Sequence, residues 1–225
     1  MTTIQIYGIK TLEDALAIVA MGAHHIGLEV ESDPADQESI RGIIEHLPSS
    51  VTAVLLPLFT DPDEIIEVTS ILAPDILHLC ADVDEYSEKG MQRIRSGLPS
   101  IQIMLSVPVG PPGYADRIDS LTIALELQQN ADFILLDTKF PDDEAGLPGW
   151  IGVTGKVHDW EVSRRIVERC SVPVILAGGL TPDNVAEAIH TVHPWGIDSN
   201  TPLNLRKGQK DLGKVQAFIE AIRHA

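Results

Sequence analysis

The sequence has few cysteines, no long apolar run and little positive charge. Its two cysteines, Cys80 and Cys170, lie far apart and form no C-x-x-C pair. Disulfide scaffolds and zinc ribbons need more thiols at closer spacing, so we expect neither, and a cytoplasmic location is the default for free thiols. No apolar run reaches the roughly 18 residues of a membrane span, and the opening MTTIQIYG has no signal-peptide pattern. We therefore expect no membrane association.

The charge balance is strongly acidic. The chain has 16 lysines and arginines against 33 aspartates and glutamates, which gives a formal net charge of −17. Nucleic acids and anionic membrane surfaces are bound by basic patches, so this composition argues against both as partners. The hydrophobic share of 44% is sufficient for a full core in a chain of 225 residues.

Short apolar runs of strand length alternate with longer amphipathic segments eight times along the chain. Most of these runs are apolar throughout, which is typical of parallel strands covered by helices. The predicted strands are residues 4–9, 25–30, 51–58, 76–80, 101–107, 133–138, 172–178 and 196–200.

Several segments between the strands carry helix start signals. Thr11 is followed three residues later by an aspartate, which is capping-box spacing. Asp61 and Thr181 each stand directly before a proline, the residue that suits a first helical turn. Asp159 precedes Trp160 and is a suitable cap for a helix that begins there. We expect helices to begin directly after these four residues.

Eight strand–helix units without a linker-like stretch predict one closed domain. The arrangement fits a TIM (β/α)8 barrel that spans residues 1–225. A doubly wound open sheet is the alternative, but its G-x-G-x-x-G fingerprint is absent after the first strand. Active sites of TIM barrels lie at the carboxyl ends of the strands, which is where the functional residues are sought.

The longest of these strand-end loops, residues 139–158, contains GLPGWIGVTGKVH and is followed by Asp159 and Trp160. Gly152 and Gly155 lie on either side of Thr154 and leave backbone N–H groups open to an anion, and Lys156 adds a positive charge. This pattern is consistent with a phosphate-binding loop, although a flexible loop before a capped helix has the same composition.

A second anion signal follows the seventh predicted strand. In LAGGLTPDNV, the Gly178–Gly179 turn presents amides before a helix start, and the last strand then ends in GIDSNTP. Loops after strands seven and eight of TIM barrels often hold a phosphate together. Both signals in this order predict that the substrate is phosphorylated.

Six segments together resemble the phosphoribosylanthranilate isomerase family of tryptophan-biosynthesis enzymes. They are YGIKTLEDA, LLDT, VTGKVHDW, LAGGLTPDNV, GIDSN and KGQKDLGKVQAFI, and their order and spacing match along the whole chain. The resemblance implies a TIM barrel that performs an Amadori rearrangement without cofactor or metal. The substrate would be a small phosphorylated ribose derivative, which opens and isomerises to a 1-deoxy-ketose phosphate. Relatives include both monomers and homodimers.

The resemblance also implies roles for individual residues. Asp137, in LLDT, matches the general acid that protonates the ring oxygen, a task that suits a carboxyl with a raised pKa. The residues expected to contact the substrate or its phosphate are Gly152, Thr154, Gly155, Lys156, Gly178, Gly179, Asp198, Asn200 and Thr201.

The chain departs from the family pattern where the general base is expected. Tyr7 stands at the position of the family's catalytic cysteine, and Gln5 at that of a nearby lysine. A phenol has a pKa near 10, against about 8.5 for a thiol, so it is rarely ionised at neutral pH. The family's Ser-Pro-Arg after the second strand is replaced by residues 34–36, Pro-Ala-Asp, which contain no arginine.

Three interpretations of Tyr7 follow. In the first, the chain is a working isomerase whose base has moved to Cys80 or His78 on the fourth strand. In the second, the substrate is a different phosphosugar, and Tyr7 acts as an acid, a stacking surface or a hydrogen-bond donor. In the third, Tyr7 fills the pocket and activity is lost.

Two other classes of function stay open beside the isomerase. One is a non-catalytic or re-purposed phosphosugar-binding paralogue. The other is a metal-dependent phosphosugar epimerase or aldolase. Its candidate ligands are the acidic run Glu29, Glu31, Asp33 and Asp36 together with Asp137, Asp198 and His78. The spacing of that run fits no known metal-binding motif, and a solvated acidic loop explains it more simply.

Overall fold

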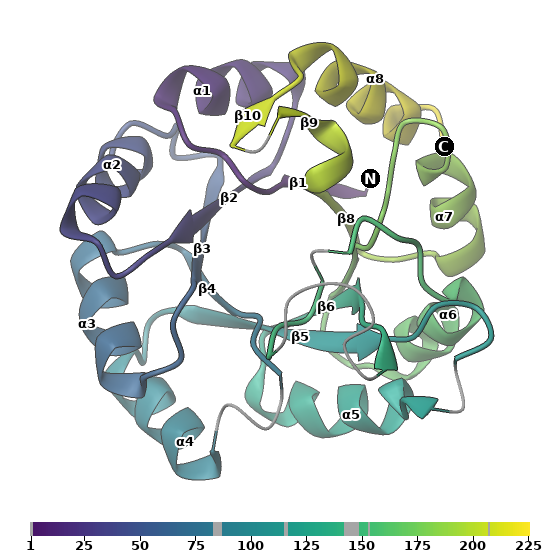
Figure 1. Ribbon diagram of the computed structural model, residues 1–225, viewed down its shortest axis with the longest axis horizontal. Helices are drawn as coiled ribbons and strands as arrows, with labels where there is room; N and C mark the ends of the chain where they lie inside the picture. Colours follow the sequence, from purple (N-terminus) through teal and green to yellow (C-terminus); the bar gives the residue numbers. More distant parts are fainter. Residues whose placement is uncertain (1, 83–86, 115–116, 142–148, 153, 207) are drawn as a thin grey trace.

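The protein is a closed barrel of eight parallel strands with the helices around the outside (Figure 1). The computed structural model describes residues 2–82, 87–114, 117–141, 149–152, 154–206 and 208–225. Each strand pairs with the next in the chain, and β8 closes the barrel on β1. The strands are β1 Thr3–Ile6, β2 His25–Val30, β3 Thr52–Pro57, β4 Ile76–Leu79, β5 Gln102–Val109, β6 Phe133–Thr138, β7 Val174–Leu176 and β8 Gly196–Ser199. The predicted TIM barrel is confirmed.

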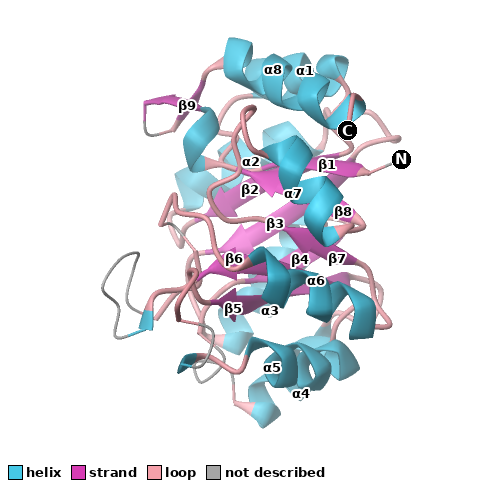
Figure 2. Cartoon of the chain, turned by 90° about the vertical axis from the view of Figure 1, so that its right-hand side faces the viewer, coloured by secondary structure: helices cyan, strands magenta, loops and turns pink. Residues whose placement is uncertain are grey.

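A helix follows each strand and covers it from outside (Figure 2). The helices are α1 Leu12–Met21, α2 Pro34–Ile44, α3 Pro62–Leu72, α4 Glu88–Gly97, α5 Ser120–Leu127, α6 Trp160–Arg169, α7 Val185–Val192 and α8 Leu212–Arg223. Among the residues that the structure describes, no helix is long and apolar enough to cross a lipid bilayer.

The core has two layers because strand residues alternate in direction. Outward residues of the strands pack against the helices in one large cluster, which includes Ile26, Leu28 and Leu136. Inward residues form a second cluster inside the barrel, which includes Tyr7, Met104 and Leu135. The interior is therefore filled with side chains up to the strand ends, and open space begins only there.

Three of the four predicted helix starts are confirmed. The side chain of Thr11 accepts a hydrogen bond from a first-turn N–H of α1, and Asp61 and Asp159 do the same for α3 and α6. Each cap satisfies backbone donors that have no partner within the helix.

The start predicted at Thr181 is wrong. Helix α7 begins at Val185, because residues 181–184 form a turn in which the Asn184 side chain accepts a hydrogen bond from the Thr181 N–H at 2.8 Å. The asparagine competes for the local backbone groups and delays the helix.

An addition that the sequence pattern did not predict lies between β8 and α8. A 3₁₀ turn, η5 Thr201–Leu203, leads into a small antiparallel pair, β9 Asn204–Arg206 and β10 Gln209–Lys210. Figure 1 shows this pair near α1 and α8. Its position matters because it carries Lys210 into the interior.

Candidate active site

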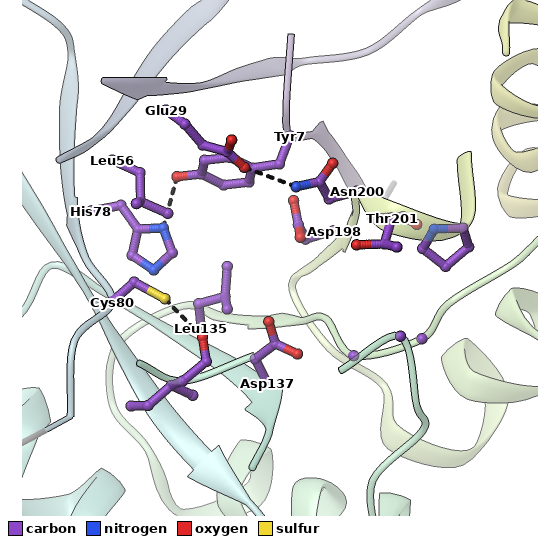
Figure 3. Close-up of a pocket in the computed structure, with 16 residues that line it drawn as sticks. Tyr7, Glu29, Leu56, His78, Cys80, Leu135, Asp137, Asp198, Asn200 and Thr201 are labelled. Carbon is purple, nitrogen blue, oxygen red and sulfur yellow. Dashed lines mark hydrogen bonds between the residues drawn. The ribbon is translucent and has the colours of Figure 1, made fainter. Parts of the chain in front are cut away.

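A pocket opens at the carboxyl ends of the strands and contains about 680 Å³ of space, including its open mouth (Figure 3). It is lined by Tyr7, Glu29, Leu56, His78, Cys80, Leu135, Asp137, Ile151, Gly155, Gly178, Gly179, Asp198, Ser199, Asn200, Thr201 and Pro202. Ten of the thirteen predicted site residues are in this lining. The other three, Gly152, Thr154 and Lys156, lie outside it.

Asp137 is the fifth residue of β6 and points into the pocket (Figure 3). Its Oδ1 accepts a hydrogen bond from the Thr138 N–H at 2.7 Å. Burial raises the pKa of Asp137 to about 6, against the opposing effect of that N–H. Gly152 has a φ of +91° and packs against the carboxyl, where a Cβ would overlap it. Among the described residues no ion pair holds Asp137, so its proton is available to a ligand.

Tyr7 follows β1 and is 4% exposed. Its ring packs against Gly27, where a Cβ would overlap the ring. The Tyr7 Oη lies 2.7 Å from His78 Nδ1, and His78 Nε2 lies 2.8 Å from Ser106 Oγ. Burial lowers the pKa of His78 to about 3, so the imidazole is neutral and its single N–H faces one of these two neighbours.

Neither Tyr7 nor Cys80 ionises near neutral pH. Burial, followed by the charge of Asp198, raises the pKa of Tyr7 well above its usual value. Burial likewise raises the pKa of Cys80 to about 12, and its thiol donates to the Ile151 carbonyl at 3.1 Å. Together with the neutral His78, these groups form a wall that holds its protons tightly.

Asp198, on β8, is 6% exposed and is the most deeply buried of the three carboxyls in the lining. One carboxylate oxygen, Oδ1, accepts a hydrogen bond from Gln5 Nε2 at 3.2 Å. Burial and then the charge of Asp137 raise the pKa of Asp198 to about 8, although Gln5 and Lys210 oppose the shift. Asp198 and Asp137 thus have pKa values on either side of neutrality.

The turn after β8 is held from behind by a buried lysine. Lys210 Nζ donates to the Asn200 carbonyl at 3.0 Å, to Asn200 Oδ1 at 2.8 Å and to Asn204 Oδ1 at 2.7 Å. Asn200 Nδ2 in turn donates to Glu29 Oε1 at 3.0 Å. Burial lowers the pKa of Lys210 to about 8, with Asp198 and Glu29 opposing that shift. Sequence reasoning missed Lys210, because nothing in the spacing of KGQKD marks one lysine as buried.

Three loops meet at one end of the pocket. Gly178 and Gly179, after β7, have φ values of +80° and +61°. A Cβ on Gly178 would overlap Thr138 and His158, and one on Gly179 would overlap the backbone at Lys156. The loop after β6 therefore packs directly on the Gly178–Gly179 turn, and Gly155 and Thr201 join these glycines in the lining.

The three predicted residues outside the lining have other contacts. Gly152 supports Asp137, as described above. The Thr154 hydroxyl accepts a hydrogen bond from the Lys156 N–H at 3.1 Å, and the Lys156 side chain is exposed. The Lys156 carbonyl accepts from Thr138 Oγ1 at 2.6 Å, which ties this loop to β6.

The acidic run after β2 is engaged in local structure. Asp33 caps α2 through the Ala35 N–H, and Asp36 accepts from the Glu31 N–H. Within the described part of the chain, no group of three or more histidines, cysteines, aspartates or glutamates is placed to hold a metal ion.

Comparison with known proteins gives one consistent result. The family model for N-(5'phosphoribosyl)anthranilate (PRA) isomerase matches residues 4–221. The N-(5'-phosphoribosyl)anthranilate isomerase of Methanocella arvoryzae is 34% identical over 230 residues, which cover 99% of each chain. The enzyme of that name from Pseudomonas fluorescens is 36% identical over 224 residues, covering 98% of this chain and 95% of the relative.

Solved structures agree with the sequence relatives. The phosphoribosyl anthranilate isomerase of Thermotoga maritima superposes with a TM-score of 0.78 at 26% identity, over 100% of both chains. A phosphoribosyl anthranilate isomerase in complex with reduced 1-(o-carboxyphenylamino)-1-deoxyribulose 5-phosphate superposes with a TM-score of 0.76 at 25% identity, also over 100% of both.

We predict that Asp198→Asn raises the free energy of unfolding by an amount that grows with pH. The unfolded carboxyl loses its proton near its ordinary pKa of 3.8, whereas the folded one keeps it to about pH 8. Between these values the folded wild type binds a proton that the unfolded chain lacks, so its stability falls as pH rises, by at most about 1.4 kcal/mol per pH unit. The asparagine has no such dependence. Urea unfolding at pH 5, 6, 7 and 8 measures the difference.

The matched control is Asp63→Asn, because Asp63 is an exposed carboxyl paired with Arg93 at 2.6 Å. Its effect on the free energy of unfolding should vary little over the same pH range. Parallel pH curves for wild type and Asp198→Asn would contradict the raised pKa of Asp198.

Proposed function

This chain belongs to the N-(5'-phosphoribosyl)anthranilate isomerase family, and from that premise we propose that it catalyses the isomerisation of phosphoribosylanthranilate in tryptophan biosynthesis. The observation that carries the proposal is the arrangement of one pocket. A protonatable carboxyl, Asp137, lies in the same lining as glycine and asparagine turns that suit a phosphate.

The chemistry begins at the ribose ring. Asp137 donates a proton to the ring oxygen as the C1–O bond breaks, which leaves an iminium group between C1 and the anthranilate nitrogen. Loss of the C2 proton then gives an enolamine, and its rearrangement to a ketone gives the 1-deoxy-ketose phosphate. A carboxyl whose pKa is raised to about 6 keeps part of its proton near neutral pH, as this first step requires.

The phosphate site is built from backbone. We infer that Gly155, the Gly178–Gly179 turn and the Asn200–Thr201 turn surround the phosphate, because all three segments line the pocket. The positive φ values of the glycines open the backbone to a close approach. Lys210 does not line the pocket but holds the Asn200–Thr201 turn in place, through its three hydrogen bonds to Asn200 and Asn204.

We infer that Tyr7 stands where relatives carry a catalytic cysteine, and that it is not the base. Its pKa is raised, not lowered, by burial and by the carboxyls around it. It does not fill the site either, because a pocket of about 680 Å³, including its open mouth, is present with the Tyr7 ring in the lining. His78 and Cys80, the two other candidates for the base, are equally unsuited. The imidazole, with a pKa of about 3, binds a proton only weakly, and the thiol, with a pKa of about 12, does not ionise near neutral pH.

The arginine of the family pattern has no cationic replacement at positions 34–36, which begin α2. We infer that Lys10 serves the anthranilate carboxylate instead. Lys10 Nζ donates at 3.0 Å to the carbonyl of Glu29, a residue of the pocket lining, and lies 4.0 Å from Asp36 Oδ1. We do not adopt the metal-dependent epimerase alternative, because Asp33 and Asp36 are engaged in the local hydrogen bonds described above.

Complementation of a tryptophan auxotroph that lacks the isomerase tests the proposal directly. We predict that the wild-type gene restores growth without tryptophan and that Asp137→Asn does not, because the amide supplies no proton to the ring oxygen. General acid catalysis contributes about 10²- to 10⁴-fold, so the purified variant should lose at least about 100-fold in kcat. Absence of growth at every expression level of the wild type would reject the proposal.

We also predict that Lys210→Met raises KM for the phosphorylated substrate by about tenfold or more, with a smaller change in kcat. A hydrogen bond to a charged group contributes about 1.5–3 kcal/mol, and about 1.4 kcal/mol is tenfold in affinity. The matched control is Lys214→Met, because Lys214 is exposed and donates only to the Asn204 carbonyl at 3.2 Å. Equal KM values for the two variants, with folding confirmed by circular dichroism, would refute the role of Lys210.

A further inference from the structure

Asp198 lies on the side of the pocket where the family's base is expected. Strands β1 and β8 are paired with Gln5 opposite Asp198, and Tyr7 is two residues beyond Gln5 on the same inward face. Figure 3 shows the Asp198 carboxyl near the Tyr7 ring and Asn200, with Asp137 pointing into the same space from β6. The two carboxyls therefore face the same part of the pocket.

We propose that Asp198 is the general base that removes the C2 proton, in place of the cysteine that relatives carry at the position of Tyr7. The proposal rests on the isomerase function proposed above. It assigns acid and base to a pair of carboxyls on β6 and β8 and gives Tyr7 a supporting role in the pocket wall.

The hydrogen bonds around the pocket leave Asp198 as an available acceptor. Tyr7 Oη is bonded to His78 and the Cys80 thiol to the Ile151 carbonyl, as described above. Asp198 accepts through Oδ1 from Gln5, and within the described residues no protein group bonds to its other oxygen, Oδ2. That oxygen is therefore an acceptor that the pocket can offer to a C–H bond, on the strand that pairs with β1.

Asp137 and Asp198 together account for every proton transfer in the reaction. Asp137 gives its proton to the ring oxygen, and Asp198 takes the proton from C2 to form the enolamine. Asp198 then returns its proton to C1 while the enol hydroxyl at C2 gives its proton to Asp137. The two carboxyls end as they began, and no external acid, base or oxidant is needed.

The charged and titratable groups that face Asp198 favour one shared proton. Asp137 and Glu29 oppose its ionisation, whereas Lys210 and the Gln5 amide favour it, and Tyr7 and Cys80 stay neutral beside it. With pKa values of about 6 and about 8, the carboxyl pair holds one proton between these pH values, more often on Asp198 than on Asp137. The reactive form is the smaller fraction in which the proton lies on Asp137 and Asp198 is ionised, and the limbs of the pH profile belong to the pair. One acid and one base are present only in that state, so kcat/KM should follow a bell-shaped curve with limbs near pH 6 and pH 8.

Asp198→Asn is the central variant of the test. We expect it to lower kcat by at least about 100-fold, while its affinity for reduced 1-(o-carboxyphenylamino)-1-deoxyribulose 5-phosphate, measured by calorimetry, changes much less. Its residual activity should lose the limb near pH 6 that rises with pH, because the group that must ionise is gone. Substrate deuterated at C2 should show a larger isotope effect on kcat in this variant than in the wild type.

Two further variants sharpen the assignment. Asp63→Asn removes an exposed carboxyl outside the pocket lining and should leave kcat and the pH profile unchanged. Tyr7→Phe removes only the phenol hydroxyl and should cost less than about tenfold in kcat, far below the loss expected when a general base is removed.

The outcomes separate this inference from the proposed function. A wild type that is active and an Asp198→Asn variant that keeps more than a tenth of its kcat would overturn the role of Asp198 and leave the isomerase function standing. Loss of analogue binding in Asp198→Asn would overturn it too, because the residue would then act in binding. An equal loss in Tyr7→Phe would transfer the role to the phenol. A wild type without isomerase activity would overturn both proposals together.

Discussion

Closure of the barrel is the constraint on which the site depends. Because β8 pairs with β1, residues almost two hundred positions apart lie side by side, and Gln5 donates to Asp198 across that seam. Closure also removes water from the interior up to the strand ends, where Asp137 and Asp198 lie. Desolvation is the largest cause of the raised pKa of both carboxyls. The same geometry therefore provides the position and the reactivity of the pair.

Tyr7 and His78 bring two aromatic side chains into the pocket lining. Tyr7, His78 and Ser106 form a buried hydrogen-bonded chain in which each polar group has a partner, so the large phenol in the interior leaves no unpaired donor. Gly27 supplies the room for the ring. Tyr7 and Cys80 line the cavity and keep their protons near neutral pH, and in the mechanism that we propose the acid–base chemistry is therefore carried out by carboxyls.

The sequence allowed much of the fold to be predicted, and less of the site. Apolar runs at the period of a βα unit identified the barrel. The Gly178–Gly179 turn was singled out because it presents backbone amides after a strand, and the structure gives both glycines a positive φ. The start of α7 was misplaced, because the Asn184 side chain holds a turn that Thr181-Pro182 does not reveal. The burial of Lys210 and the Tyr7–His78 hydrogen bond depend on contacts between elements that are distant in the sequence, so local sequence patterns could not predict them.

The most direct measurement is a crystal structure of this protein with reduced 1-(o-carboxyphenylamino)-1-deoxyribulose 5-phosphate bound. The account predicts the phosphate against the backbone of the Gly178–Gly179 and Asn200–Thr201 turns, with C2 facing Asp198 and the hydroxyl formed from the ring oxygen facing Asp137. A phosphate seated at another end of the pocket would contradict the account. So would an Asp198 carboxyl turned away from the sugar carbons.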